Sequence, residues 1–121
     1  MNPSLNQSNI QLRNFTDTDI DSLHKLLQDA GSHGHREWPD TTSDLTSVLE
    51  FPRVQPHKNL ALAHLKNEVV GYAIVEPEKN IGRSIVGFTS TSTNSAILAQ
   101  LLEWGTNRAR QETPIAHIAT L

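Results

Sequence analysis

One segment of this chain, residues 83–110, constrains its fold more than any other. It begins with an alternating apolar run, continues through seven consecutive Ser, Thr or Asn residues at 89–95, and ends in an amphipathic stretch. This pattern predicts a strand over 83–90, a polar loop, and a helix over 95–110. Such a loop faces the free N–H groups and the positive dipole end of the following helix, which is the layout of an anion site.

The same loop lacks the glycines that a phosphate-binding loop normally uses. No glycine occurs from Thr89 to Gln100, although glycine allows a backbone to approach a ligand closely. Two interpretations stay open: a loop that only caps the helix, and a weakened phosphate cradle.

Composition limits the classes of function. The 121 residues are enough for one domain or part of one, and the absence of cysteine excludes disulfides, thiolate zinc sites and cysteine nucleophiles. The net charge of -3 argues against nucleic acid or an anionic membrane as the main partner. No apolar run approaches the length of a membrane span. We expect a cytoplasmic protein whose first nine residues, 1–9, are flexible.

The remaining elements are predicted from hydrophobic spacing and breaker residues. Strands are expected near 9–15, 60–65, 69–76 and 114–121, and helices near 20–30 and 43–51. Pro52 and Pro56 are expected to end the second helix, and Pro77–Gly82 to form a turn. The order β-α-α-β-β-β-α-β indicates an α+β (mixed α/β) fold with a central antiparallel meander flanked by helices. The last strand should run parallel to the strand at 83–90.

Three segments, taken in order, resemble the GNAT N-acetyltransferase family. Ile10–Leu27 is similar to its opening strand and helix, Leu60–Glu78 to its central hairpin, and Ile85–Arg110 to its fourth strand, pyrophosphate loop and third helix. The chain is most similar to the N-terminal half of a tandem GNAT protein. The resemblance implies a single partial GNAT-like domain over 10–121, C-terminally incomplete after the fifth strand.

The resemblance also implies a reaction, the transfer of an acetyl group from acetyl-CoA to the primary amine of a small molecule or peptide. In this family the fourth strand offers backbone groups to the pantetheine arm, and the next loop wraps the pyrophosphate with N–H groups. The residues that this implies for cofactor binding are Phe88, Thr89, Ser90, Thr93, Asn94, Ser95, Ala96, Ile97 and Leu98.

The loop departs from the family signature, Gln/Arg-x-x-Gly-x-Gly/Ala, at all three fixed positions. Thr93 stands at the basic or amide position, Ala96 at the first glycine and Leu98 at the second. Losing the positive residue removes a charge-assisted hydrogen bond worth about 1.5–3 kcal/mol. The Leu98 side chain adds an isobutyl group where phosphate oxygens approach the backbone. We therefore expect weak or no acetyl-CoA binding and activity in this chain alone.

No catalytic acid or base is assigned from the sequence. Glu76 and Glu78 follow the apolar part of a strand, where a carboxylate serves either as a general base through a water or as a solvated turn residue. Tyr72 and Trp104 fit core positions with a polar atom, and no residue matches the tyrosine that acts as general acid in the family.

The histidines do not indicate a metal site. His33, His35 and Glu37 offer zinc-type ligands, but two histidines two residues apart in a loop lack the helical spacing that would place them on one face. This argues against a metal-dependent hydrolase. The other four, His24, His57, His64 and His117, are scattered and support no site.

A second function class stays open beside the enzyme. The chain could be a non-enzymatic interaction module derived from a GNAT domain, because a sheet that ends in an edge strand favours pairing with another strand. Its partner would then be a second copy, giving a homodimer, or a missing C-terminal domain.

Overall fold

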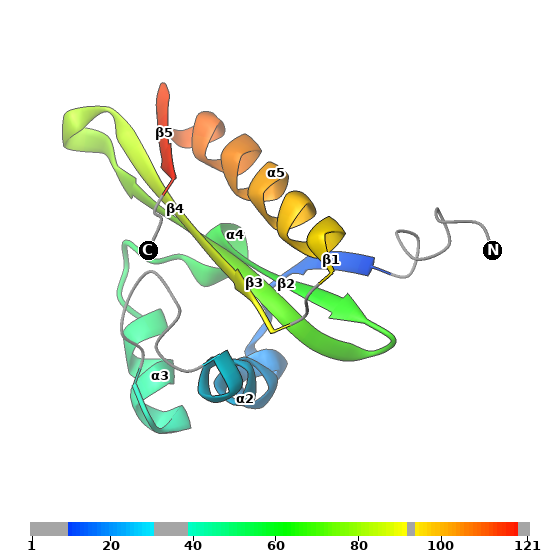
Figure 1. Cartoon of the computed structure of the whole chain (residues 1–121). Helices are drawn as coiled ribbons and strands as arrows, with labels where there is room; N and C mark the ends of the chain where they lie inside the picture. The colour runs from blue at the N-terminus through cyan, green and yellow to red at the C-terminus, as the bar shows by residue number, and fades with distance from the viewer. Residues whose placement is uncertain (1–9, 31–38, 92–93, 119–121) are drawn as a thin grey trace.

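A computed structural model describes residues 10–30, 39–91 and 94–118. The strands in these described ranges form a five-stranded sheet of order β1-β2-β3-β4-β5 (Figure 1). The strands are β1 (Ile10–Asn14), β2 (Leu60–Leu65), β3 (Glu68–Glu78), β4 (Arg83–Ser90) and β5 (Ile115–Ile118). The first four pair antiparallel in sequence, whereas β5 runs parallel to β4. The predicted α+β fold, with its meander and final parallel strand, is confirmed.

Helix α5 (Ser95–Glu112) lies across one face of the sheet (Figure 1). Its residues Ile97, Leu101 and Ala109 are buried against apolar side chains of the strands. Trp104 is partly buried and packs beside them, as predicted for a core residue with a polar atom. Because these contacts recur at helical spacing, they fix which face of α5 meets the sheet.

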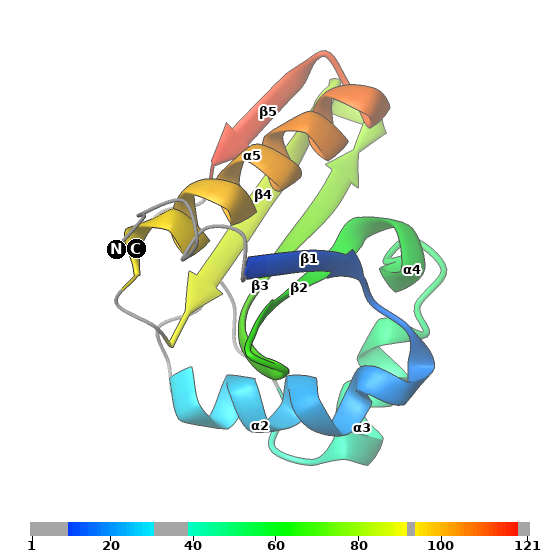
Figure 2. The same ribbon diagram turned by 90° about the vertical axis from the view of Figure 1, so that its right-hand side faces the viewer.

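Helices α2 (Ile20–Ala30) and α3 (Thr42–Leu49) cover the other face (Figure 2). In α2, leucines at 23, 26 and 27 point into a core that also contains Tyr72, which is fully buried. The α3 N-terminus is capped by Thr41, whose side chain accepts a hydrogen bond of 3.1 Å from the Asp44 N–H. The core position predicted for Tyr72 is confirmed.

Two prolines act differently from the prediction. Pro56 follows the second helix, as expected, but it also begins a further short helix, α4 (Pro56–Asn59). The sequence did not predict this helix. Proline is well suited to the first helical turn because the N–H that it lacks has no partner there. Pro77 lies inside β3 rather than in a turn. It is tolerated because, among the described strands, β4 is the one partner of β3 beyond Ile74.

Both hairpin turns contain residues with a left-handed backbone. Lys66 and Asn67 both have positive φ, at 53° and 67°, and they join β2 to β3 as predicted. Gly82, with φ of 71°, ends the 3-10 turn at Lys79–Ile81 before β4. None of the helices in the described ranges combines the length and the apolarity needed to cross a lipid bilayer.

Candidate functional site

The C-terminal half of β4 is the first part of the candidate site. β4 pairs with β3 over its whole length, but its pairing with β5 covers only Arg83–Val86. Within the described residues, Gly87–Ser90 therefore have a neighbouring strand on one side only. The backbone N–H and C=O groups of Gly87–Thr89 on the other side are placed to pair with an extended ligand.

Neighbouring residues of this stretch face opposite sides of the sheet. Phe88 is partly buried and packs beneath α5. Thr89 is opposite Tyr72, whose side chain is in the core beneath α2 and α3, so Thr89 shares that face. The two predicted binding residues are adjacent in sequence, but only Phe88 lies on the α5 side.

The start of the loop is bound to the neighbouring strand. The Ser90 hydroxyl donates to the Val70 carbonyl oxygen at 3.0 Å, and the Thr91 N–H donates to the same oxygen at 2.9 Å. These contacts extend the β3–β4 pairing beyond the strand and hold the chain where it leaves the sheet. They also engage the Ser90 hydroxyl within the protein.

The N-terminus of α5 is the second part of the candidate site. Asn94 is the N-cap: its Oδ1 accepts from the Ala96 N–H at 2.9 Å, and its carbonyl oxygen accepts from the Ile97 N–H at 3.1 Å. Ser95 is exposed, Ala96 is partly buried and Ile97 is buried. Leu98 is 39% exposed, so its side chain does not rotate into the core.

The segment that forms this region carries no side-chain charge of its own. No titratable side chain occurs from Phe88 to Leu102. Within this segment, the positive end of the α5 dipole is therefore the source of attraction for an anion.

Solved structures with this arrangement of elements are known, whereas no protein-family model and no curated protein sequence matches the chain. Ard1 from Thermoplasma volcanium superposes with a TM-score of 0.66 at 15% identity, covering 86% of this chain and 66% of that one. A GNAT family acetyltransferase from Staphylococcus aureus gives 0.63 at 18% identity, covering 93% and 87%. This chain has the GNAT acetyltransferase fold.

A third match connects this fold with CoA. Aminoglycoside N-acetyltransferase AAC(6')-Iy, solved in complex with CoA, superposes with a TM-score of 0.54 at 17% identity and covers 93% of this chain and 77% of that one. At these identities the likeness establishes the GNAT fold. The reaction of this chain has to be argued from its own residues.

Some predicted residues cannot be placed on the GNAT fold. Thr93 lies outside the described residues, as do His33, His35 and Glu37 of the zinc hypothesis. No group of three or more His, Cys, Asp or Glu side chains that could hold a metal ion occurs in the described ranges.

The two glutamates considered as general bases lie away from the loop in this GNAT fold. Glu76 is opposite Ile85 and Glu78 is opposite Arg83, while Ser90 ends the same strand. At about 3.3 Å per residue, these pairing positions are roughly 16 and 23 Å from Ser90 along β4. Glu78 accepts a hydrogen bond of 2.9 Å from Arg83 Nε, and the two side chains form an ion pair across the turn between β3 and β4.

The sequence reading missed an ion pair on the opposite edge of the sheet. Arg13 of β1 donates through Nη1 to Asp19 Oδ2 at 2.7 Å and through Nη2 to the second carboxylate oxygen, Oδ1. Hydrogen bonding to Arg13 is the largest cause that lowers the pKa of Asp19 to about 2. Burial lowers the pKa of the neighbouring His64, and the Arg13 charge lowers it further. The pair could not be predicted from the sequence, because a separation of six residues between Arg13 and Asp19 matches no local pattern that indicates a contact.

Proposed function

We propose that this chain is an acetyl-CoA-dependent N-acetyltransferase homologue, of the class that transfers acetyl to a primary amine, and that it is weak or inactive as this chain alone. One observation carries the proposal. The N-terminus of α5 closely follows the C-terminal half of β4, which has β3 as its one neighbouring strand among the described residues. Such an arrangement suits a ligand with an extended arm and an anionic group. The CoA-bound structural neighbour supports it.

The proposed binding residues are those of β4, the loop and the first turn of α5: Phe88, Thr89, Ser90, Thr93, Asn94, Ser95, Ala96, Ile97 and Leu98. Among them, the backbone of β4 at Phe88 and Thr89 would pair with the pantetheine arm. Residues 94–98 would face the pyrophosphate with N–H groups and the helix dipole.

The described residues fit this ligand only in part. The Ala96 and Ile97 N–H groups already bond to Asn94, so a phosphate has to compete with these contacts. No lysine or arginine occurs between Phe88 and Leu102 to add a charge-assisted bond. The exposed Leu98 side chain adds an apolar group to the same helical turn. These features together predict low affinity.

The chemistry implied is direct attack of an amine on the thioester that acetyl-CoA supplies. The amine nitrogen bonds to the thioester carbon, the C–S bond then breaks with the CoA thiolate as leaving group, and the proton lost by the nitrogen is taken up by that thiolate or by water. Since the segment from Phe88 to Leu102 has no titratable side chain, its contribution is to bind and orient. No residue of the chain is assigned as acid or base.

A titration with acetyl-CoA tests the proposal. Millimolar acetyl-CoA should raise the melting temperature and shift the amide resonances of 88–99. Pantetheine, which has no phosphate, should bind more weakly because it cannot use the helix N-terminus. The absence of any shift at millimolar acetyl-CoA would contradict the proposal for this chain.

Two matched leucine variants locate the site. Leu98→Ala should tighten acetyl-CoA binding several-fold, because it removes an isobutyl group from the first turn of α5. Leu102 is one turn further along and 37% exposed, close to the 39% of Leu98. Leu102→Ala should therefore leave the affinity unchanged. Equal effects of the two changes would count against pyrophosphate binding at this end of α5.

We propose a non-enzymatic interaction module as the second candidate, because of the exposed surface of β5. Ile115 is 59% exposed on this strand, and β4 is the one neighbour of β5 in the described residues. An outer strand with an exposed apolar side chain favours pairing with a second copy of the chain.

A further inference from the structure

A pocket of about 580 Å³ lies beside the start of α2 and the end of α3. Two of its lining residues, Phe15 and Leu49, are buried and belong to the core between the sheet and these helices. Phe51 and Pro52 also line it, and Phe51 is 60% exposed. A mainly apolar pocket of this size is typical of sites for small organic ligands.

The ionisable groups of this pocket are mostly acidic. Asp17 and Glu50 line it together with His57, and no lysine or arginine is among its described lining residues. His57 Nε2 lies 3.0 Å from Asp17 Oδ1, and its ring centroid is 6.0 Å from that of Phe15. Carboxylates beside aromatic rings are complementary to a cation with an apolar body.

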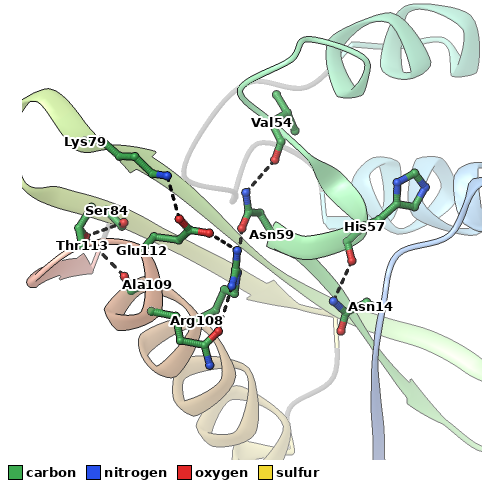
Figure 3. Close-up of polar contacts among 11 residues, drawn as sticks. Asn14, Val54, His57, Asn59, Lys79, Ser84, Arg108, Ala109, Glu112 and Thr113 are labelled. Atoms are coloured by element: carbon green, nitrogen blue, oxygen red, sulfur yellow. Dashed lines mark hydrogen bonds and ion pairs between the residues drawn. The ribbon is translucent and has the colours of Figure 1, made fainter.

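Polar contacts fix residues 54–59, a segment that supplies Gln55, Pro56 and His57 to the pocket's wall (Figure 3). Asn14 Nδ2 donates to the His57 carbonyl oxygen at 2.8 Å, which joins α4 to the end of β1. The buried Asn59 donates through Nδ2 to the Val54 carbonyl oxygen at 3.0 Å and accepts from Arg108 Nε of α5 at 3.0 Å. A wall fixed in this way lowers the ordering cost of binding.

The backbone of the same wall contains a strained residue. Gln55 lines the pocket with φ of 46° and ψ of 64°, in the left-handed region, and it directly precedes Pro56. A non-glycine residue rarely adopts this conformation, and it persists only where the surroundings impose it. Such strain is found more often at ligand sites than elsewhere.

The pocket is separate from the proposed acetyl-CoA site. Phe15 directly follows β1, whereas the loop to α5 follows β4, three strands away in the sheet. At a strand spacing of about 4.8 Å, this is roughly 14 Å across the sheet. Figure 2 shows the start of α2 near α3 and α4, at the opposite end from the β4–α5 connection.

We propose that this pocket binds a small organic ammonium ion, whose apolar body contacts Phe15 and Phe51 and whose charged head lies beside Glu50 and Asp17. The ring of Phe51 supplies apolar area and a π-face, and the two carboxylates supply the opposite charge. The occupant is an arylalkyl or alkyl amine. This inference does not depend on acetyl transfer.

A pair of probes with the same ring and opposite charge tests the proposal. The intact chain is titrated with 2-phenylethylammonium and, separately, with 3-phenylpropionate, and amide resonances are followed by NMR. The ammonium probe should shift residues 15–20 and 46–57 with a saturable curve, and the carboxylate should bind about tenfold more weakly. Equal affinity of the two probes, or no saturable shift with the ammonium probe, would overturn the proposal.

Exposed side chains allow variants that should still fold. Phe51→Ala should weaken ammonium binding by about threefold or more, and Glu50→Gln should weaken it while leaving 3-phenylpropionate unaffected or tighter. Ile81→Ala and Glu103→Gln are the matched controls, since both residues are exposed and lie outside the pocket. If the shifts instead fall on 88–98, the pocket proposal fails while the acetyl-transfer proposal gains support.

Discussion

Gly105 makes the closest contact between α5 and the sheet among the glycines whose surroundings are described. A Cβ at this position would lie 2.4 Å from Cγ1 of Val86, which is itself buried. We expect Gly105→Ala to destabilise the protein by about 1–3 kcal/mol through overpacking, although alanine favours a helix by about 1 kcal/mol. Urea unfolding measures the change.

A double-mutant cycle separates overpacking from other effects of Gly105→Ala. Val86→Ala removes the methyl groups that the new Cβ meets, so the double variant should lose less free energy than the sum of the single changes. Additive losses would show that the clash is not the cause. Gly82→Ala is a useful comparison, because its φ of 71° causes strain while no atom lies within 4 Å of the new Cβ.

Asp19 links stability to pH at the edge of the sheet. The Arg13 hydrogen bonds are the largest cause that lowers the pKa of Asp19 from 3.8 to about 2. The ionised carboxylate therefore stabilises the folded state at every pH above the pKa that Asp19 has in the unfolded chain. This contribution is present above about pH 4 and is lost as the pH falls towards about 2. Arg13 is partly exposed to solvent, which screens the interaction. We therefore expect the Asp19 carboxylate to contribute roughly 1–2 kcal/mol to the free energy of unfolding.

The Asp19→Asn variant measures this contribution by urea unfolding across pH. It should be less stable than the parent at pH 7 and should lose much of the pH dependence between about 2 and 4. The loss includes the bond that Asp19 accepts from the Thr16 N–H at 2.8 Å. Asp21→Asn is the control, because Asp21 is exposed on α2. An unchanged acid slope in Asp19→Asn would contradict the assignment.

At the scale of elements, the N-cap of α5 is the best test of the loop. Asn94→Ala removes the acceptor of the Ala96 N–H and should cost about 1 kcal/mol. Asn107→Ala, at an exposed position inside the same helix, should be neutral or slightly stabilising. Thermal unfolding measures both. A neutral Asn94→Ala would mean that the cap contributes nothing to folding.

This part of the chain also shows which structural features could be predicted from the sequence. Residues 83–110 were predicted well because their signals are local: alternation in β4, cap residues in the loop, and helical spacing in α5. Pro56 was misread because a proline that follows one helix can also begin the next. The pocket was missed because His57 meets Asp17 from 40 positions away, and no pattern in the sequence indicates which distant residues will be neighbours.

At the scale of the whole molecule, the two proposed functions use different parts of the GNAT fold. Acetyl-CoA would bind between β4 and the N-terminus of α5, whereas a second copy of the chain would pair with β5. Because β5 is paired with the first half of β4, the two surfaces adjoin without sharing residues. Binding of acetyl-CoA and association can therefore be measured separately on one sample.

Sedimentation velocity over a range of concentrations tests the interaction module. If β5 pairs with a second copy, the 13.4 kDa chain should form a dimer at high concentration. Ile115→Lys should return it to the monomer, because a lysine on an outer strand opposes strand pairing. Ile81→Lys is the matched control, because Ile81 is 55% exposed and Ile115 is 59% exposed. This change should leave the dimer intact. A monomer at every concentration, or equal loss in both variants, would rule out association through β5.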